Sequence, residues 1–394
     1  MAAPRFFATA AVVLAVALVW VSPAAATGES DAQGFPNWAE RVIHEWMNRA
    51  RADPAAELAT CSGCGEKACY APIAPLAYDN RLNRAARFHS DEMVKQGYFS
   101  HDSACNVIST ISQLYPGACD GAASCACMGG TKSCAGPCTD FGTRVSLFGV
   151  SASAEIIAGA ADPEQAFYQW LHESYPLAQC GYNPGNGHRY SILASTGGVG
   201  VGVTGSPVGD FSFGAGAIPA RAPSGAHYPR QAATVEAWAS WYDTVAPESA
   251  HVVVDGSCTP MALTRGSGGN GAWMARLTGV GSGCHRYFFL FKTSAGAEVT
   301  YPTTGSLGIG PSGCADWEDT RTAGMCGGVS SGSDLAGGGG DGGTDPDGGS
   351  GGGGGCGCRV GRARGDGPFA LVIVIGVIGL ARAIRRSRSN PCRR

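Results

Sequence analysis

The stretch "GHRYSILASTGGVGVGV", from Gly187 to Val203, indicates how the first part of this chain folds. Its β-branched and aromatic residues occur in short runs broken by glycine, which is a pattern typical of strands. We therefore predict strands in "HRYSILAST" and "GVGVGVTG", and a further strand in "DFSFGAGA". On this prediction His188 lies at the start of a strand.

Helical patterns precede these strands. "WAERVIHEWMNRAR" (Trp38–Arg51) has apolar residues at helical spacing, and "LNRAARFHSDEMVKQG" carries a second apolar stripe that ends at Gly97. Asp162 and Pro163 suit the N-cap and first position of a third helix, which we expect to reach about Ser174. Helices packed on an antiparallel sheet predict an α+β domain over residues 36–217.

A second domain is expected after this one. Residues 218–234 are rich in Pro and Ala without a period, so we interpret them as a linker. Residues 235–327 alternate in the manner of strands with glycine at the turns, which predicts a small all-β sandwich-like domain. Nothing in its sequence resembles a catalytic site, so a binding or spacer module is expected.

Both ends of the chain carry export signals. Residues 1–26 have an early arginine, an apolar run and small residues at a cleavage position, as in a secretory signal peptide. A Gly-rich linker (328–355) precedes Cys356 and Cys358, the apolar segment 368–381 and an arginine cluster. That order resembles the C-terminal sorting signal of myxobacterial surface proteins, and the resemblance implies processing near the cysteines of residues 356–394. The alternative is a single-pass membrane anchor, although the segment is shorter than the ~20 residues that span a bilayer.

The cysteines also favour an exported protein. Of seventeen, three belong to the C-terminal tail (Cys356, Cys358 and Cys392), ten lie between Cys61 and Cys180, and four lie between Cys258 and Cys326, so each of the last two regions can pair internally in an oxidising compartment. "CSGC" (Cys61–Cys64) has the spacing of a redox or zinc motif, but disulfide stapling is favoured because other cysteines crowd it. The net charge of −3, with no basic patch outside the tail, gives no indication of a nucleic-acid partner.

Two histidines and two glutamates are candidates for a site. His101 follows "YFS", and Glu155 lies in "SAEIIAG". Glu173 falls three residues after Trp170 on the third predicted helix, and His188 lies between Gly187 and Arg189. If they converged, these side chains could ligate a divalent cation such as zinc, or share protons. Spacing alone does not bring them together.

A resemblance to a known family implies that these four side chains do lie close together. "YFSHDS", "SAEIIAG", "QAFYQWLHES" and "GHRYSILAS", in this order after the "LNRAAR…HSDEM" helix, are similar to the signature blocks of the CAP superfamily. This superfamily contains cysteine-rich secretory proteins, antigen 5 and pathogenesis-related proteins, and its module is also called the SCP domain. The resemblance covers roughly residues 38–217. It implies an α-β-α sandwich with a cavity tetrad at His101, Glu155, Glu173 and His188, in which the two histidines are the candidate ligands of a zinc-like cation.

The sequence departs from the family pattern near these residues. Ala154-Glu155-Ile156 replaces the usual Gly-Glu-Asn, whose Asn normally helps to fix the loop, and Ser191 replaces a Gln or Asn. His172 and Ser174 are alternatives to Glu173. An insertion between Asn106 and Phe141 carries five cysteines and could roof the cleft.

Three functions follow from these observations. The first is a non-enzymatic extracytoplasmic binding protein, anchored at the cell surface through the C-terminal segment. The family's links to sterol and lipid binding imply a small apolar or lipid ligand, or a surface partner, as alternatives to the cation. The second is a metal-assisted, peptidase-like hydrolase, for which no catalytic residue is identified. The third is a purely structural surface protein.

Overall fold

The computed structural model describes residues 35–117, 138–212, 219–316 and Cys326, and those before Ser330 belong to one compact unit. The expected signal peptide, Gly-rich linker and sorting signal lie outside the described residues. Within the described ranges, no helix has both the length and the apolar character needed to cross a bilayer.

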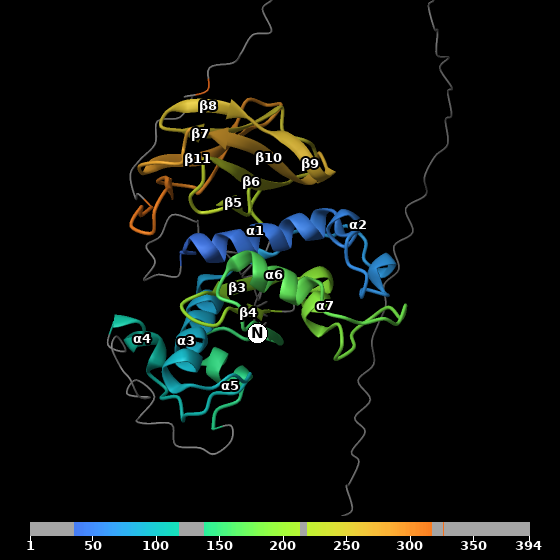
Figure 1. The fold of residues 1–394 in the computed structure, drawn as a ribbon, viewed down its shortest axis with the longest axis vertical. Helices are drawn as coiled ribbons and strands as arrows, with labels where there is room; N and C mark the ends of the chain where they lie inside the picture. Colours follow the sequence, from blue (N-terminus) through green and yellow to red (C-terminus); the bar gives the residue numbers. More distant parts are fainter. Residues whose placement is uncertain (1–34, 118–137, 213–218, 317–325, 327–394) are drawn as a thin grey trace, which may run out of the picture. The chain divides into compact units, whose positions relative to one another are not determined.

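The first part of the chain combines helices with a four-stranded sheet, in agreement with the predicted α+β class (Figure 1). The strand order is β1-β3-β4-β2, with β1 parallel to β3 and the other pairs antiparallel. Helix α3 packs on β3 and β4, whereas α1 packs on β3, α6 and α7. The elements are α1 (Trp38–Ala52), α2 (Pro54–Glu57), η2 (Lys67–Cys69), β1 (Ala77–Tyr78), α3 (Asn80–Gln96), α4 (Ile111–Leu114), α5 (Phe141–Ser146), β2 (Ala154–Ile157), α6 (Pro163–Leu171), α7 (Gly187–Ala194), β3 (Gly198–Gly202) and β4 (Val208–Phe211).

The predicted helix starts and stops are explained by capping. Asn37 and Glu40 form a capping box at the start of α1, which satisfies two backbone N–H groups reciprocally. Gly97 ends α3 at φ 66°, a left-handed conformation that favours glycine. Asp162 caps α6, and its Pro163 occupies the first turn as predicted. The helix ends at Leu171, not at about Ser174.

The predicted strand "HRYSILAST" is wrong, because this segment forms helix α7. Its buried residues Arg189, Ile192 and Leu193 follow a helical spacing of three and four residues. The β-branched and aromatic residues that suggested a strand have only slightly lower helix propensity, which burial of one helical face overcomes. The other two predictions hold, since β3 lies in "GVGVGVTG" and β4 overlaps "DFSFGAGA".

Alternating glycines in β3 allow close packing of α3. A Cβ atom at Gly200 would overlap the backbone of Leu82 and Asn83, and one at Gly202 would overlap that of Ala86. The valines between them point into the core, where Val199 and Val201 are fully buried. The period of two in this stretch therefore reflects a helix on one face of the strand and a hydrophobic core on the other.

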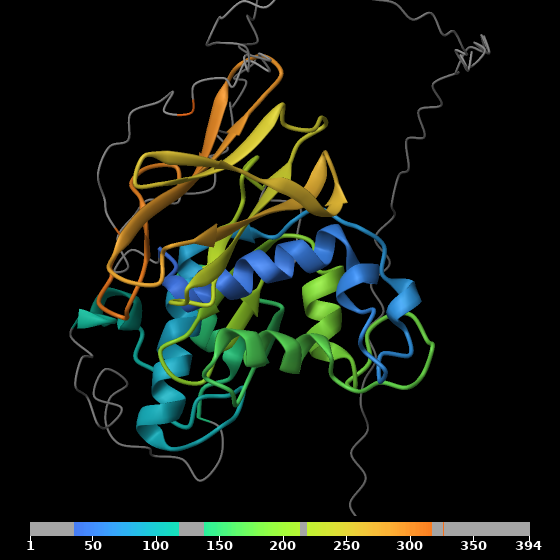
Figure 2. The ribbon, with the colours of Figure 1, turned by 45° about the horizontal axis from the view of Figure 1, so that its top comes forward.

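In the second part of the chain, the regular elements of the described residues are all strands (Figure 2). Two antiparallel sheets, β5-β6-β10-β9 and β12-β11-β7-β8 with β13 added to β11, contribute apolar side chains to one hydrophobic cluster. The strands are β5 (Gly225–Tyr228), β6 (Thr234–Tyr242), β7 (Ser249–Val254), β8 (Ser257–Pro260), β9 (Ala262–Ser267), β10 (Asn270–Thr278), β11 (His285–Lys292), β12 (Glu298–Tyr301) and β13 (Leu307–Ile309).

The segment 218–234, expected to be a linker, contains part of this structure. Strand β5 lies within it and pairs with β6, and Ser224 and His227 are fully buried. Pro223 and Pro229 lie close to either end of β5, and a strand of four residues is too short to show a period in the sequence. Helix α1 packs against β5, β6, β9 and β10, so it contacts both parts of the chain (Figure 1).

Disulfide bonds link cysteines within each part, as the cysteine distribution predicted. Cys61 bonds to Cys64, which agrees with stapling at "CSGC", and Cys69 bonds to Cys180. In the β-rich part, the disulfides join Cys258 to Cys326 and Cys284 to Cys314.

Candidate functional site

The four candidate residues form two His–Glu pairs in the structure. Nδ1 of His101 lies 3.0 Å from Oε1 of Glu155, and Nδ1 of His188 lies 2.9 Å from Oε2 of Glu173. Both histidines are partly exposed, with 48% and 32% of their side chains accessible, whereas the Glu155 side chain is 1% exposed. Each pair therefore presents an imidazole to solvent and anchors it with a carboxylate.

The His101–Glu155 pair is fixed by Arg144 of α5. The guanidinium donates to the His101 carbonyl oxygen at 2.8 Å and to Oγ of Ser103 at 3.2 Å, and its other terminal nitrogen donates to Oε2 of Glu155. Glu155 therefore uses one oxygen for the arginine and the other for the histidine. Ile156 stands where the family pattern has Asn, and the arginine provides the hydrogen bond that fixes the glutamate.

Asp210 is a third acidic group beside this pair. It is the cross-strand partner of Glu155 between β2 and β4, it is fully buried, and neither of its carboxyl oxygens has a hydrogen-bond partner among the described residues. Burial, reinforced by the negative charge of Glu155, raises the pKa of Asp210 well above its usual value. Burial would also raise the pKa of Glu155, but the charge of Arg144 and the hydrogen bond to His101 outweigh it and lower that pKa to about 2. We infer that Glu155 carries the negative charge and Asp210 the proton.

His89 of α3 also belongs to this network. Nε2 of His89 lies 2.8 Å from the carbonyl oxygen of Ser100 and 3.9 Å from Oε1 of Glu155. Its Nδ1 faces Glu92 at 3.4 Å, and Glu92 accepts a hydrogen bond from Ser103 at 3.0 Å. The position of His89 within α3 gave no signal of this role, because the contact depends on how the His101 loop crosses the helix.

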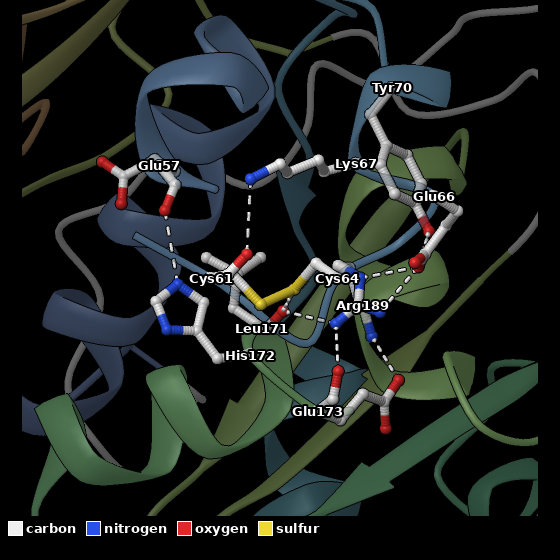
Figure 3. Close-up of a disulfide and its surroundings, with 10 residues drawn as sticks. All are labelled: Glu57, Cys61, Cys64, Glu66, Lys67, Tyr70, Leu171, His172, Glu173 and Arg189. Atoms are coloured by element: carbon white, nitrogen blue, oxygen red, sulfur yellow. Dashed lines mark hydrogen bonds and ion pairs between the residues drawn. A yellow bond between two sulfur atoms is a disulfide. The ribbon is translucent and has the colours of Figure 1, made fainter. Parts of the chain in front are cut away.

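Arg189 fixes the second pair (Figure 3). Its guanidinium donates to Glu66 at 2.7 Å and to the carbonyl oxygens of Leu171 and Glu173 at 2.9 and 2.6 Å, while its backbone N–H donates to Oε1 of Glu173 at 3.1 Å. Arg189 and Glu66 are both buried. The arginine therefore holds the chain just after α6 in the position from which Glu173 reaches His188.

The Cys61–Cys64 disulfide lies beside this second pair (Figure 3). Its loop is bound to the segment after α6, because Gly65 N–H donates to the Tyr175 carbonyl oxygen at 2.8 Å and Tyr175 N–H donates to that of Gly63 at 2.8 Å. The disulfide thus contributes to the scaffold that carries Glu66 and Glu173.

The sequence-based alternatives to Glu173 have other contacts. Ring nitrogen Nε2 of His172, which follows the last residue of α6, lies 3.3 Å from the carbonyl oxygen of Glu57 (Figure 3). Ser174 lies close to Gly63 in the disulfide loop. Glu173 does not share a helical face with Trp170, because it follows the end of α6.

The two pairs lie on elements that pack together, since α7, which carries His188, contacts β2, which carries Glu155. In the part of the chain that the structure describes, no three His, Cys, Asp or Glu side chains are grouped so that they could hold a metal ion. The paired side chains can orient imidazoles and exchange protons, and Nε2 is the nitrogen left to face a ligand in each ring.

Comparison with known protein families gives a match to the part of the chain that contains the two His–Glu pairs. Residues 47–215 match the family model described as CAP, the cysteine-rich secretory protein family, and all four paired residues lie in that range. No curated protein and no solved structure matches the chain significantly. The disulfide bonds are consistent with an extracellular location. The family match therefore supports assigning residues 47–215 to the CAP superfamily and, in general terms, supports an extracellular-type CAP protein.

Proposed function

We propose that this chain is an exported, surface-anchored binding protein whose two His–Glu pairs contact a divalent cation or a small apolar ligand. The observation that carries the proposal is the matched pairing of His101 with Glu155 and of Glu173 with His188, each through Nδ1 of the imidazole. A carboxylate at Nδ1 fixes the ring and directs Nε2 outward, which is the arrangement of histidines that bind metals or polar ligand groups.

The fit to a cation is partial. The chain offers two imidazole nitrogens of the type that zinc prefers, but the described residues contain no group of three or more suitable side chains. A cation at His101 and His188 would therefore complete its coordination with water or with a ligand. In that role it would supply a positive charge for an anionic ligand group.

An apolar ligand is supported by the surface next to the first pair. Phe99, two residues before His101, has 55% of its surface exposed. A large exposed apolar side chain beside a polar site suits a ligand with an apolar body and a polar head.

Zinc binding tests the cation. The full-length chain and its His101→Ala and His188→Ala variants are dialysed against zinc, and bound metal is counted by atomic spectroscopy. His285→Ala is the matched control, because His285 also pairs with a carboxylate, Asp255 at 2.7 Å, but in the β-rich part. We expect wild type and the control to bind equally and both other variants to bind less. Absence of zinc from all four proteins would exclude the cation.

Fatty-acid binding tests the apolar ligand. Delipidated protein is titrated with a fluorescent fatty acid, and Phe99→Ser is compared with Val245→Ser, which changes an equally exposed side chain in the β-rich part. We expect weaker binding only for Phe99→Ser. Equal binding by wild type and both variants would place the lipid elsewhere, and no binding would leave the structural surface protein as the function.

Surface anchoring is proposed from the tail sequence. Deletion of residues 356–394 is expected to release the protein into the medium, whereas Arg364→Ala within the spacer is not. Retention of the shortened chain on cells would show that another part of the protein attaches it. We propose that the β-rich part acts as a spacer or binding module.

A further inference from the structure

Arg144 connects its own helix α5 to the loop that carries His101 and to strand β2, which carries Glu155. Its side chain is fully buried, it lies on α5 after the cysteine-rich insertion, and its three side-chain hydrogen bonds end on His101, Ser103 and Glu155. The bond to His101 reaches the backbone, so the arginine controls the loop as well as the carboxylate.

Helix α5 is itself attached to the loop that carries His101. The backbone N–H of Phe141 donates to Oδ1 of Asp102 at 3.1 Å, and Ser103 N–H donates to the Thr139 carbonyl oxygen at 2.8 Å. Arg144 is therefore held relative to His101 by contacts that do not pass through Glu155. A shift of Arg144 would therefore also shift the carboxylate of Glu155.

The surroundings explain why an arginine is needed here. Glu155 and Glu92 are both buried and both interact electrostatically with Arg144, so removal of its charge would leave Glu155 without its cation. A lysine could supply the charge but has a single ammonium group, which cannot reproduce the planar fork that reaches two segments at once.

We propose that Arg144 is a positioning residue for the His101–Glu155 pair. It binds Oε2 of Glu155 so that Oε1 faces the imidazole, and it holds the His101 backbone at the distance where Nδ1 meets that oxygen. This inference concerns the same His101–Glu155 pair as the proposed function and rests on it in that respect alone. Its test needs neither zinc nor lipid.

The test is the nitrogen NMR signature of His101 in the full-length chain labelled with ¹⁵N-histidine, recorded at one fixed pH. We expect Nδ1 of wild type to show the shift of a ring nitrogen hydrogen-bonded to a carboxylate. Arg144→Met should move that shift to the value of an unconstrained exposed histidine, and Arg144→Lys should give an intermediate value with faster amide exchange at His101 and Ser103.

Arg41→Met is the matched control. Arg41 is also fully buried and also pairs with a carboxylate, Asp316 at 2.6 Å, but among the described residues its hydrogen bonds end on Asp316 and on the Pro36 carbonyl oxygen, not on the His101 loop. We expect this variant to lose stability and keep the wild-type His101 signature. An unchanged signature in folded Arg144→Met, or the same change in Arg41→Met, would overturn the proposal. If Arg144→Met does not fold, a wild-type signature and wild-type amide exchange in Arg144→Lys would overturn it.

Discussion

Oγ of Ser224 donates a hydrogen bond to Oε2 of Glu45 over 2.5 Å, and Oγ of Ser240 donates to Oε1 of the same carboxyl group at 3.0 Å. Glu45 lies on α1, and the serines lie beside β5 and in β6 of the β-rich part. Asn48 of α1 adds a hydrogen bond to Ser224 at 3.0 Å. Glu45 and Asn48 of α1 are therefore buried against these strands.

Glu45 makes stability depend on pH. Burial raises its pKa to about 8, although the serine hydrogen bonds oppose this rise. Because the folded state holds the proton more tightly than the unfolded state, the free energy of unfolding should fall as the pH rises from about 4.5 to about 8. Glu45→Gln should remove the part of this dependence that Glu45 causes, which amounts to a few kcal/mol, because each tenfold difference in proton affinity between the two states corresponds to about 1.4 kcal/mol. Asp210, whose pKa burial also raises, contributes a dependence of the same sign that should remain. Urea unfolding from pH 5 to pH 9 measures it.

Glu236→Gln is the control for this experiment. Glu236 pairs with Arg276 at the surface, where its side chain is 39% exposed. The pH dependence of this variant should equal that of wild type. A Glu45→Gln protein that retains the wild-type slope would show that another group causes it.

Gly200→Ala should prevent α3 from packing on β3. The new methyl group would overlap the backbone of Leu82 and Asn83, which cannot move aside as a side chain can. Overpacking of this kind costs about 1–3 kcal/mol or more. Gly159→Ala is the matched control, because nothing lies within 4 Å of its Cβ position. Thermal unfolding distinguishes them, and equal midpoints would refute the close approach.

Two disulfides of the first part, Cys69–Cys180 and Cys61–Cys64, should differ in their contribution to stability. Cys69–Cys180 closes a loop with a sequence separation of 111, and Cys61–Cys64 one with a separation of 3. Loop-closure entropy then gives nearly 5 kcal/mol for the first and about 2 kcal/mol for the second. Paired Cys→Ser variants unfolded in urea measure both values. The opposite order would mean that the short disulfide stabilises chiefly through the folded loop.

Loss of Arg189 should destabilise the second His–Glu pair. Arg189→Met leaves Glu66 buried without its cation, which typically costs about 3–5 kcal/mol. Adding Glu66→Leu removes the unpaired charge and should restore part of the stability. The free energies of the single and double variants form a cycle that gives the coupling. A double variant no more stable than Arg189→Met would argue against the ion pair.

Much of the fold follows from local signals. Asn37, Asp162, Pro163 and Gly97 mark helix ends by chemistry that acts within one turn, so these positions can be read directly. Helix α7 could not be predicted in this way, because the burial of Arg189 against Glu66, which favours a helix over a strand, involves a residue far away in the sequence. The predicted strands in the β-rich part were recognised where they are long and alternating, whereas β5 was concealed in four residues of an expected linker.

The sequence by itself determined the residue types of the candidate site, the order of the family's motifs and the separation of the cysteines into two groups. Only the tertiary structure decided that each histidine faces one glutamate, that Arg144 and Arg189 hold those glutamates, and that Asp210 lies beside Glu155. The physical reason is that buried charges are stabilised by partners brought from distant parts of the chain, and such partners leave no periodic pattern in the sequence.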